Sequence, residues 1–203
     1  MGRTSDARER LLRAAGDLLW ERSYYSVTVD DICTRSGVNR GSFYHFFESK
    51  SALTVAALQY LWDTSGRPAF EACFSPAIAP LQRIADFLEQ VQRFHFAKSE
   101  ELGHVPGSPI FSLGCEVGSE EPAVIENVRE IQLAQLRYFE TAIHDAMAEE
   151  AIEPCEPHTQ ALRLRAMMEG IVSDARIMND VDRLKALTHL PTTILRLKSA
   201  AAT

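Results

Sequence analysis

Residues 28–53 read TVDDICTRSGVNRGSFYHFFESKSAL, and this stretch decides the fold. Thr28 can cap a short helix, and Gly37 can end it because glycine readily adopts the positive φ that such an ending needs. Val38 then lies in a turn, and a polar start opens a second helix. Two short helices joined by a tight turn predict a helix-turn-helix whose second helix is the recognition helix. The inward-facing side chains are expected to be Val29, Ile32, Cys33, Phe43 and Phe47.

The second helix has a composition that suits the major groove of DNA. Arg40 carries the fork that reads guanine O6 and N7, and Gly41 lets the backbone approach DNA closely. Nearby hydroxyl, imidazole and ammonium groups suit phosphate oxygens. A three-helix packing unit without a nucleic-acid partner is the alternative, and Arg3 is either a minor-groove arm or a segment with no fixed contact. The candidate DNA-binding residues are Thr28, Asn39, Arg40, Gly41, Ser42, Tyr44, His45 and Lys50.

Helices are expected on both sides of this motif. From Asp6 to Arg22 apolar residues recur every three or four positions, and Ser5 is placed to cap that helix. A turn follows over residues 23–26. Downstream, a long helix starts at about Lys50 and ties the small domain to the rest of the chain.

On these residues the chain resembles the TetR family of one-component bacterial transcription regulators. The motifs that carry the resemblance lie between Thr28 and Leu53, and the match covers about the first 60 residues. Beyond them the chain is similar to the family only in length and helical character. Ser23 stands where the family commonly has glycine, and Phe46 where it has a polar residue or histidine, which weakens the expectation of a phosphate contact there.

The resemblance implies an all-α protein with two parts. Residues 1–50 would form the helix-turn-helix DNA-binding domain, and residues 51–203 a larger helical domain for ligand binding and dimerisation. The implied function is that of a homodimeric repressor, without catalytic activity, that binds a palindromic operator in double-stranded DNA and is released by a small-molecule effector. An activator, or a regulator that answers to a protein partner, remains an open alternative.

Charge and composition agree with this division. The net charge is −7, but residues 1–50 carry eight basic and seven acidic side chains, so the acidic excess lies downstream. No apolar run reaches the roughly 18 residues that span a bilayer, and the N-terminus has no apolar leader segment. We therefore expect a cytoplasmic protein with no membrane partner. The four cysteines are widely spaced, so we expect no disulfide, metal or cofactor.

The downstream region predicts helices over about residues 80–98 and 122–150, with a Gly- and Pro-containing loop between them. His95 and Gln132 are polar residues on otherwise apolar faces. Each is either a core residue bonded to a backbone carbonyl or a polar anchor in an apolar effector pocket. The candidate pocket residues are His95, Phe96, Phe111, Cys115, Gln132, Phe139 and Met168.

Cys115 suggests a second mode of regulation, the sensing of oxidants or electrophiles. Its neighbours Glu116, Glu120 and Glu121 are acidic and oppose the thiolate that such chemistry needs. An enzyme that pairs Cys115 with a histidine, His104 or His144, is less favoured because no orienting residue or oxyanion motif accompanies it.

Two broad apolar stripes close the sequence, and either the body of the protein or a second copy can cover them. In the family that the chain resembles, the last two helices form the dimer interface. Pro191 should kink or restart the final helix. The stripes are Leu164, Met168, Ile171, Val172, Ala175 and Met178, then Leu184, Leu187, Leu190, Ile194, Leu195 and Leu197.

Overall fold

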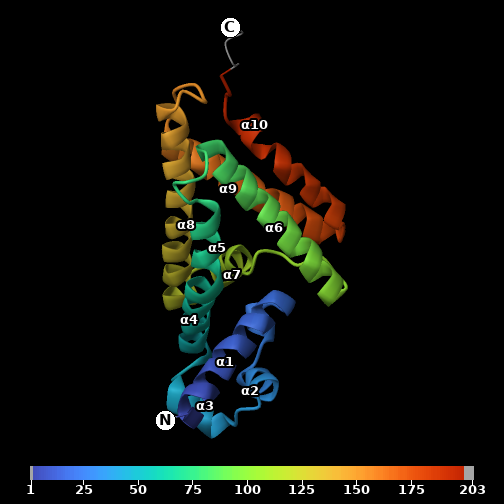
Figure 1. Cartoon of the computed structure of the whole chain (residues 1–203). Helices are drawn as coiled ribbons and strands as arrows, with labels where there is room; N and C mark the ends of the chain where they lie inside the picture. Colours follow the sequence, from blue (N-terminus) through green and yellow to red (C-terminus); the bar gives the residue numbers. More distant parts are fainter. Residues whose placement is uncertain (1, 199–203) are drawn as a thin grey trace. The chain divides into compact units, whose positions relative to one another are not determined.

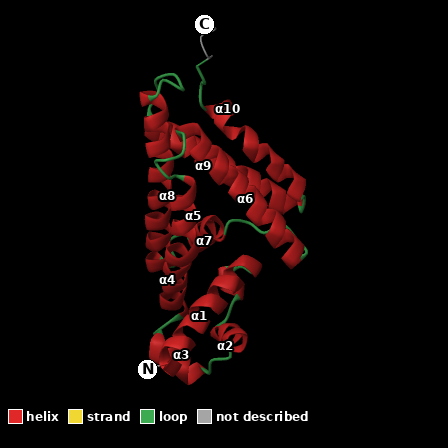
Figure 2. Ribbon diagram, in the orientation of Figure 1, coloured by secondary structure: helices red, strands yellow, loops and turns green. Residues whose placement is uncertain are grey.

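The computed structural model describes residues 2–198, with side chains from Asp6 onward. This part of the chain is built of helices, and no strand occurs in it beyond one isolated bridge between Ile152 and Leu197 (Figure 2). The predicted all-α fold is confirmed. None of the helices described combines the length and apolar character needed to cross a membrane.

The chain folds into two compact units. Unit 1 contains the residues up to Arg67 together with Gly107–Gln132, and unit 2 contains Pro68–Pro106 and the residues from Leu133 onward. The predicted division after residue 50 does not coincide with these units, because a segment from the middle of the sequence packs with the N-terminal helices.

Unit 1 contains the helix-turn-helix. Its helices α1, α2, α3 and α4 are coloured from blue to teal in Figure 1. The elements of unit 1 are α1 (Gly2–Glu21), the 3₁₀ turn η1 (Tyr24–Ser26), α2 (Val29–Ser36), α3 (Arg40–Phe46), α4 (Lys50–Leu61), the π-helical turn η2 (Trp62–Gly66), α7 (Pro109–Val117) and the start of α8 (Pro122–Ala148).

One core unites α1, α2, α3 and α4. Phe43, at 0% exposure, and Phe47, at 6%, face inward as predicted, and so does Ile32. Burying an aliphatic or aromatic side chain stabilises the fold by about 1.5–3 kcal/mol, so this cluster holds the four helices together. The buried members are Leu11, Leu12, Ala14, Ala15, Leu18, Val27, Ile32, Val38, Phe43, Phe47, Leu53 and Ala57.

Ion pairs and backbone contacts fix α1 against α2. Arg35 donates two hydrogen bonds of 2.7 Å to the Glu21 carboxylate, and Arg10 donates one of 3.1 Å to the carbonyl oxygen of Ser36. The helix α1 begins at Gly2, earlier than the predicted cap at Ser5. The side chain of Arg3, the proposed minor-groove arm, lies outside the residues whose side chains are described.

Unit 2 is built of long helices around an aromatic cluster. The helix α6 runs beside η3, which packs on α9 (Figure 1). The buried Arg83 on α6 donates to Asp145 of α8 at 2.6 Å and to the Ile78 carbonyl at 2.7 Å, so its charge is compensated. The elements are α5 (Arg67–Cys73), α6 (Pro80–Leu102), most of α8, α9 (Pro157–Met178), the 3₁₀ helix η3 (Val181–His189) and α10 (Leu190–Ile194).

Two features of the C-terminal region can be compared with the predictions from the sequence. Pro191 lies in the first turn of α10 and restarts the helix after η3, as expected for a residue without a backbone donor. Most of the second predicted stripe is internal, since Leu184, Leu187, Leu190 and Leu195 are all buried. That stripe therefore packs within unit 2 and does not form a free surface.

Candidate DNA-binding site

The turn between α2 and α3 is fixed by its caps. Thr28 and Asp31 form a reciprocal capping box in which the Thr28 hydroxyl accepts from the Asp31 amide at 3.1 Å. Gly37 ends α2 with φ of +65°, a left-handed conformation that favours glycine. Asn39 caps α3 by accepting a 2.8 Å hydrogen bond from the Ser42 amide. These local contacts confirm the helix-turn-helix and set the direction of α3.

The structure places most of the candidate DNA contacts on the outside of this motif. Asn39, Arg40, Tyr44 and His45 are exposed, whereas Ser42 is half-buried. Two of the candidates also have a structural role, because the Asn39 side-chain oxygen and the Thr28 hydroxyl cap helices. The assignment of all eight residues to DNA contact stays a prediction.

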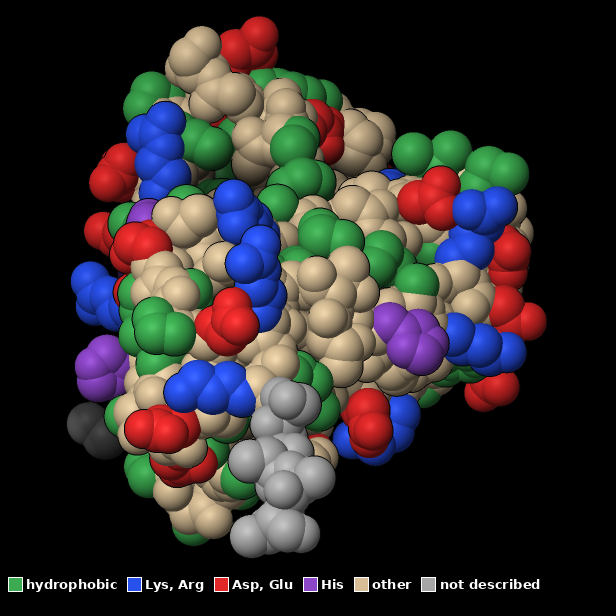
Figure 3. Space-filling model, turned by 90° about the horizontal axis from the view of Figure 1, so that it is seen from above, with side chains coloured by type: hydrophobic (Ala, Val, Ile, Leu, Met, Phe, Trp, Pro, Cys, Tyr) green, Lys and Arg blue, Asp and Glu red, His purple; other side chains and the backbone are tan. Residues whose placement is uncertain are grey.

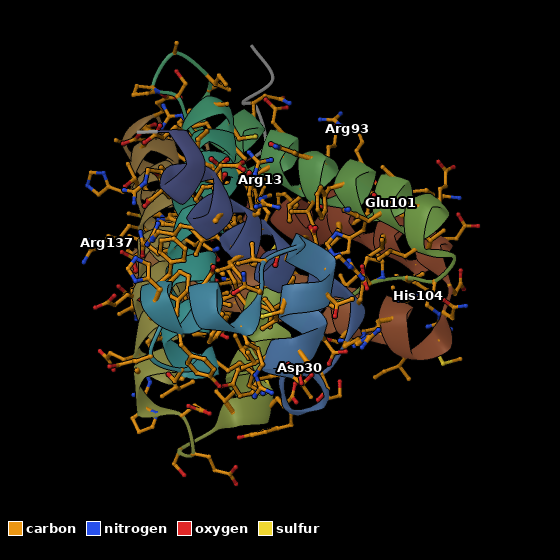
Figure 4. The ribbon with its side chains drawn as sticks, turned by 90° about the horizontal axis from the view of Figure 1, so that it is seen from below. Arg13, Asp30, Arg93, Glu101, His104 and Arg137 are labelled. Atoms are coloured by element: carbon orange, nitrogen blue, oxygen red, sulfur yellow. The ribbon has the colours of Figure 1, made fainter. Side chains whose placement is uncertain are left out.

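Arg40 has two polar neighbours. Its Nη1 lies 3.3 Å from the Asp30 carboxylate of α2, and its guanidinium is near the hydroxyl of Tyr44, one turn later on α3. The Tyr44 hydroxyl, followed by the charge of Asp30, raises the pKa of Arg40. Figure 4 labels Asp30 on α2. The motif predicted Arg40 at this site. It assigned no role to Asp30, because the sequence does not show that this carboxylate lies against Arg40.

Lys50 is engaged within unit 1. Its Nζ donates to the carbonyl oxygens of Tyr24 at 2.9 Å and Val27 at 3.0 Å, and it lies 4.0 Å from the centroid of the Tyr24 ring. Burial lowers the pKa of Lys50, against the opposing influence of Glu121 and Glu116. The side chain thus ties the start of α4 to η1, a role that its position in the motif did not reveal.

Glutamates from the end of α7 and from the turn between α7 and α8 bind η1. The Glu116 carboxylate accepts hydrogen bonds from the Ser23 hydroxyl and from the backbone amides of Tyr24, at 3.0 Å, and Tyr25, at 3.2 Å. Two further bonds of 2.8 Å join the Tyr25 hydroxyl to Glu120 and the Tyr24 hydroxyl to Glu121. We call this set of contacts the glutamate clasp.

The hydrogen bonds of the clasp favour the ionised form of Glu116 and the neutral form of Tyr25. Burial by itself raises the pKa of Glu116, but the bonds from Ser23, Tyr25 and Tyr24 outweigh it, and the net result is a lowered pKa. The bond to Glu120 and partial burial raise the pKa of Tyr25 to about 12. The clasp joins residues more than ninety positions apart, so no local pattern in the sequence signals it.

Two family models match the chain. One, described as bacterial regulatory proteins of the tetR family, matches residues 11–57, and another, described as a tetracyclin repressor-like C-terminal domain, matches residues 80–190. The second match alone covers more than half of the 203 residues. The chain belongs to the TetR family. It is a transcriptional regulator with a helix-turn-helix DNA-binding domain.

Known relatives of this TetR-family protein are also regulators. The transcriptional regulator AcuR of Cereibacter sphaeroides is 30% identical over 113 residues, which cover 56% of this chain and only 50% of AcuR. A TetR transcriptional regulator from Chloroflexus aurantiacus is 29% identical, with a TM-score of 0.82 over 98% of this chain and 100% of that one. The regulatory protein TetR from Rhodobacter sphaeroides is 25% identical, with a TM-score of 0.81 and coverage of 93% and 98%.

The residues predicted to bind an effector in this TetR-family regulator are divided between the units. Phe111, Cys115 and Gln132 belong to unit 1, and His95, Phe96, Phe139 and Met168 belong to unit 2. Phe139 is buried among the rings of Phe70, Phe74 and Phe87. His95 is buried, and its Nδ1 lies 2.9 Å from the Val91 carbonyl oxygen, which is the core-histidine alternative. Burial lowers the pKa of His95.

Asn127 is a buried polar residue that sequence analysis missed. It lies on α8 in unit 1 at 7% exposure, and its Nδ2 donates to Gln59 of α4 at 3.4 Å. Its Oδ1 is buried without a hydrogen-bond partner in the described part of the chain. An unpaired buried carbonyl is costly, which makes Asn127 a candidate anchor for a donor group on a ligand. Its polar character in the middle of an apolar helix face was the available signal.

The cysteine and the two histidines considered for a thiol-based enzyme belong to different units. Cys115 is exposed on α7 in unit 1, whereas His104 and His144 belong to unit 2. In the residues that the structure describes, no group of three or more His, Cys, Asp or Glu side chains is arranged to hold a metal ion.

Proposed function

We propose that this protein is a homodimeric repressor that binds a palindromic operator through α2 and α3 and is released by a small, mainly apolar effector. The observation that carries the proposal is the capped α2–turn–α3 motif with Asn39, Arg40 and Tyr44 exposed on its surface. Exposed side chains on the first turns of a recognition helix are those that meet base edges. We propose a cytoplasmic location for this activity.

The homodimer is supported by an uncovered apolar face on α9. Met167 is 42% exposed, Met178 56% and Ile177 79%, although the opposite side of the same helix is buried in unit 2. A shallow hollow between α9 and η3 includes Met167 and Gly170, and no atom lies within 4 Å of the place where a Cβ on Gly170 would be. A second copy of the helix can approach closely there, and the two recognition helices of a dimer would read half-sites about 34–36 Å apart.

The glutamate clasp offers a route from effector to DNA. It joins α7 and the turn before α8 to η1, which precedes α2, and Lys50 connects η1 to α4. An effector that favours a conformation with the clasp open would weaken DNA binding, because each ligand can shift the equilibrium only by its differential affinity for the two states. Asn127, with its unpaired oxygen, is the polar anchor that we propose for such an effector.

A band shift on the DNA upstream of the protein's own gene tests the proposal. We expect retardation at low salt that is lost in Arg40→Ala and Tyr44→Ala, and release by compounds found in a thermal-shift screen of apolar molecules. Absence of retardation at low salt, with and without the compounds, would overturn the repressor proposal.

A thiol-based response is the second candidate, favoured by the exposure of Cys115. Treatment with an electrophile such as N-ethylmaleimide should then release DNA from the wild-type protein and leave the complex of Cys115→Ser intact. Equal release in both proteins would eliminate this candidate.

A further inference from the structure

An acidic side chain lies among the proposed DNA contacts. Asp30 is in the first turn of α2, and its side chain is 66% exposed. Its carboxylate lies 3.3 Å from Nη1 of Arg40, the first residue of α3. The capping box of α2 uses Thr28 and Asp31, so the carboxylate of Asp30 is not needed to cap the helix.

The position is electrostatically unfavourable for binding DNA in general. A carboxylate on a surface that faces phosphates repels them, and an exposed ion pair adds little to the stability of the fold. Asp30 also neutralises Arg40, one of the few cations on α3. A residue that weakens binding to every DNA sequence is useful where it increases the difference in affinity between the operator and other sequences.

The geometry of the guanidinium shows how Asp30 can do this. An isolated arginine at the start of a helix has a long, flexible stem, and the positive end of the helix dipole does not favour its charge. The Asp30 carboxylate, 3.3 Å from Nη1, restrains that stem, and this contact does not use the other N–H groups of the fork. Reading guanine takes two parallel donors of one fork, so restraint before binding favours the bidentate contact over a loose phosphate contact.

We propose that Asp30 is a positioning residue that sets sequence discrimination by holding Arg40 ready to read a base pair. The inference rests on the proposed function, in which Arg40 contacts a base edge. It predicts that removing the carboxylate leaves the affinity for arbitrary DNA equal or higher while the preference for the operator falls.

The test uses DNA sequences that the wild-type protein enriches from a random 30-base-pair pool. Fluorescence anisotropy then gives the affinity for the enriched duplex, for each single-base-pair variant of a half-site, and for a random duplex, at several salt concentrations. The proteins compared are wild type, Asp30→Asn, Asp30→Glu and Arg40→Lys. The matched control is Glu126→Gln, because the Glu126–Arg129 pair of 3.4 Å has side chains 64% and 63% exposed, close to those of the Asp30–Arg40 pair.

Arg40→Lys should lose the preference for one base pair of the half-site. At that base pair, the ratio of affinities for the enriched duplex and its variant should be about tenfold smaller in Asp30→Asn than in wild type, which is within the range of one bidentate base contact. Its affinity for the random duplex should be unchanged or up to about fivefold tighter, the scale of an exposed ion pair. Asp30→Glu should recover part of the discrimination, and Glu126→Gln should behave as wild type.

Full discrimination in Asp30→Asn, in a protein whose circular dichroism matches wild type, would overturn the inference and leave the proposed function intact. Loss of affinity for all duplexes equally would also overturn it, since that would mark a structural role. If the wild-type protein enriches no sequence, the proposed function fails and the inference fails with it.

Discussion

The ammonium group of Lys50 is enclosed by two carbonyl oxygens and the face of an aromatic ring. Replacing it by methionine keeps the apolar stem but leaves the carbonyls of Tyr24 and Val27 without this donor. We expect Lys50→Met to lose about 1–3 kcal/mol of unfolding free energy, the usual cost of orphaning partly buried polar groups.

Urea unfolding followed by circular dichroism measures this loss. The control is Lys185→Met, because Lys185 forms an exposed pair with Asp182 and its removal should cost under about 1 kcal/mol. An equal effect of both substitutions would refute the structural role of Lys50.

Gly37 is the other residue whose backbone geometry restricts substitution. At φ of +65°, an alanine would be strained by about 1–2 kcal/mol, and its Cβ would lie 3.4 Å from Arg10 Nη1, which bonds the Ser36 carbonyl. Gly37→Ala should therefore lower the thermal midpoint clearly, whereas Gly37→Asn should lower it less because asparagine tolerates this conformation. Equal midpoints for both variants in differential scanning calorimetry would show that φ at this position does not limit the stability.

At the scale of elements, the glutamate clasp makes the attachment of η1 to α7 dependent on pH. The pKa of Glu116 is lowered in the folded protein, so its stabilising contribution is present above the unfolded value near 4.5 and is lost as pH falls through the folded value. Glu116→Gln should therefore lower the thermal midpoint at pH 7, and the gap from wild type should narrow below about pH 4.5.

Thermal unfolding between pH 3 and pH 7 provides the measurement. Glu126→Gln is the control, since Glu126 is exposed and its partner Arg129 lies only three residues away. A gap between wild type and Glu116→Gln that stays constant across this pH range would contradict the assigned role of the carboxylate.

The helices themselves follow local rules, and so most were predictable. Proline or a side-chain cap begins α2, α3, α6, α7 and α9, and their ends fall at residues such as Gly37, Gly103 and Asn179. What the sequence did not predict is how far a helix extends without a cap, as at the start of α1, and that the second apolar stripe is internal.

At the scale of the whole molecule, the uncovered face of α9 predicts the oligomeric state. Ile177→Asp places a charge on the most exposed apolar residue of that face, and burying it against a second copy would be costly. We expect this variant to sediment as a monomer and to lose cooperative binding to a two-half-site duplex.

Leu133→Asp is the matched control, because Leu133 on α8 is also an exposed apolar residue, at 55%. Sedimentation velocity should give the wild-type value for this control. If Ile177→Asp still sediments as a dimer, this face of α9 does not form the proposed interface.

The net charge of −7 is a property of the whole molecule that bears on DNA binding. Acidic and basic side chains are interspersed on the face shown in Figure 3, with no continuous basic surface there. Attraction to phosphate depends on the few cations at the contact and not on the sum over the chain. A net negative charge is therefore compatible with DNA binding through α3.

The sequence alone determined the helix-turn-helix, because caps, turn glycines and the period of apolar residues act over three or four positions and need no partner from elsewhere in the chain. It also placed Arg40 at the start of the second helix of that motif. Only the tertiary structure revealed that Lys50 is enclosed, that Asp30 pairs with Arg40 and that three glutamates bind η1. These contacts join residues ten to almost a hundred positions apart, and which of many polar side chains meet over such distances is decided by packing of the whole unit.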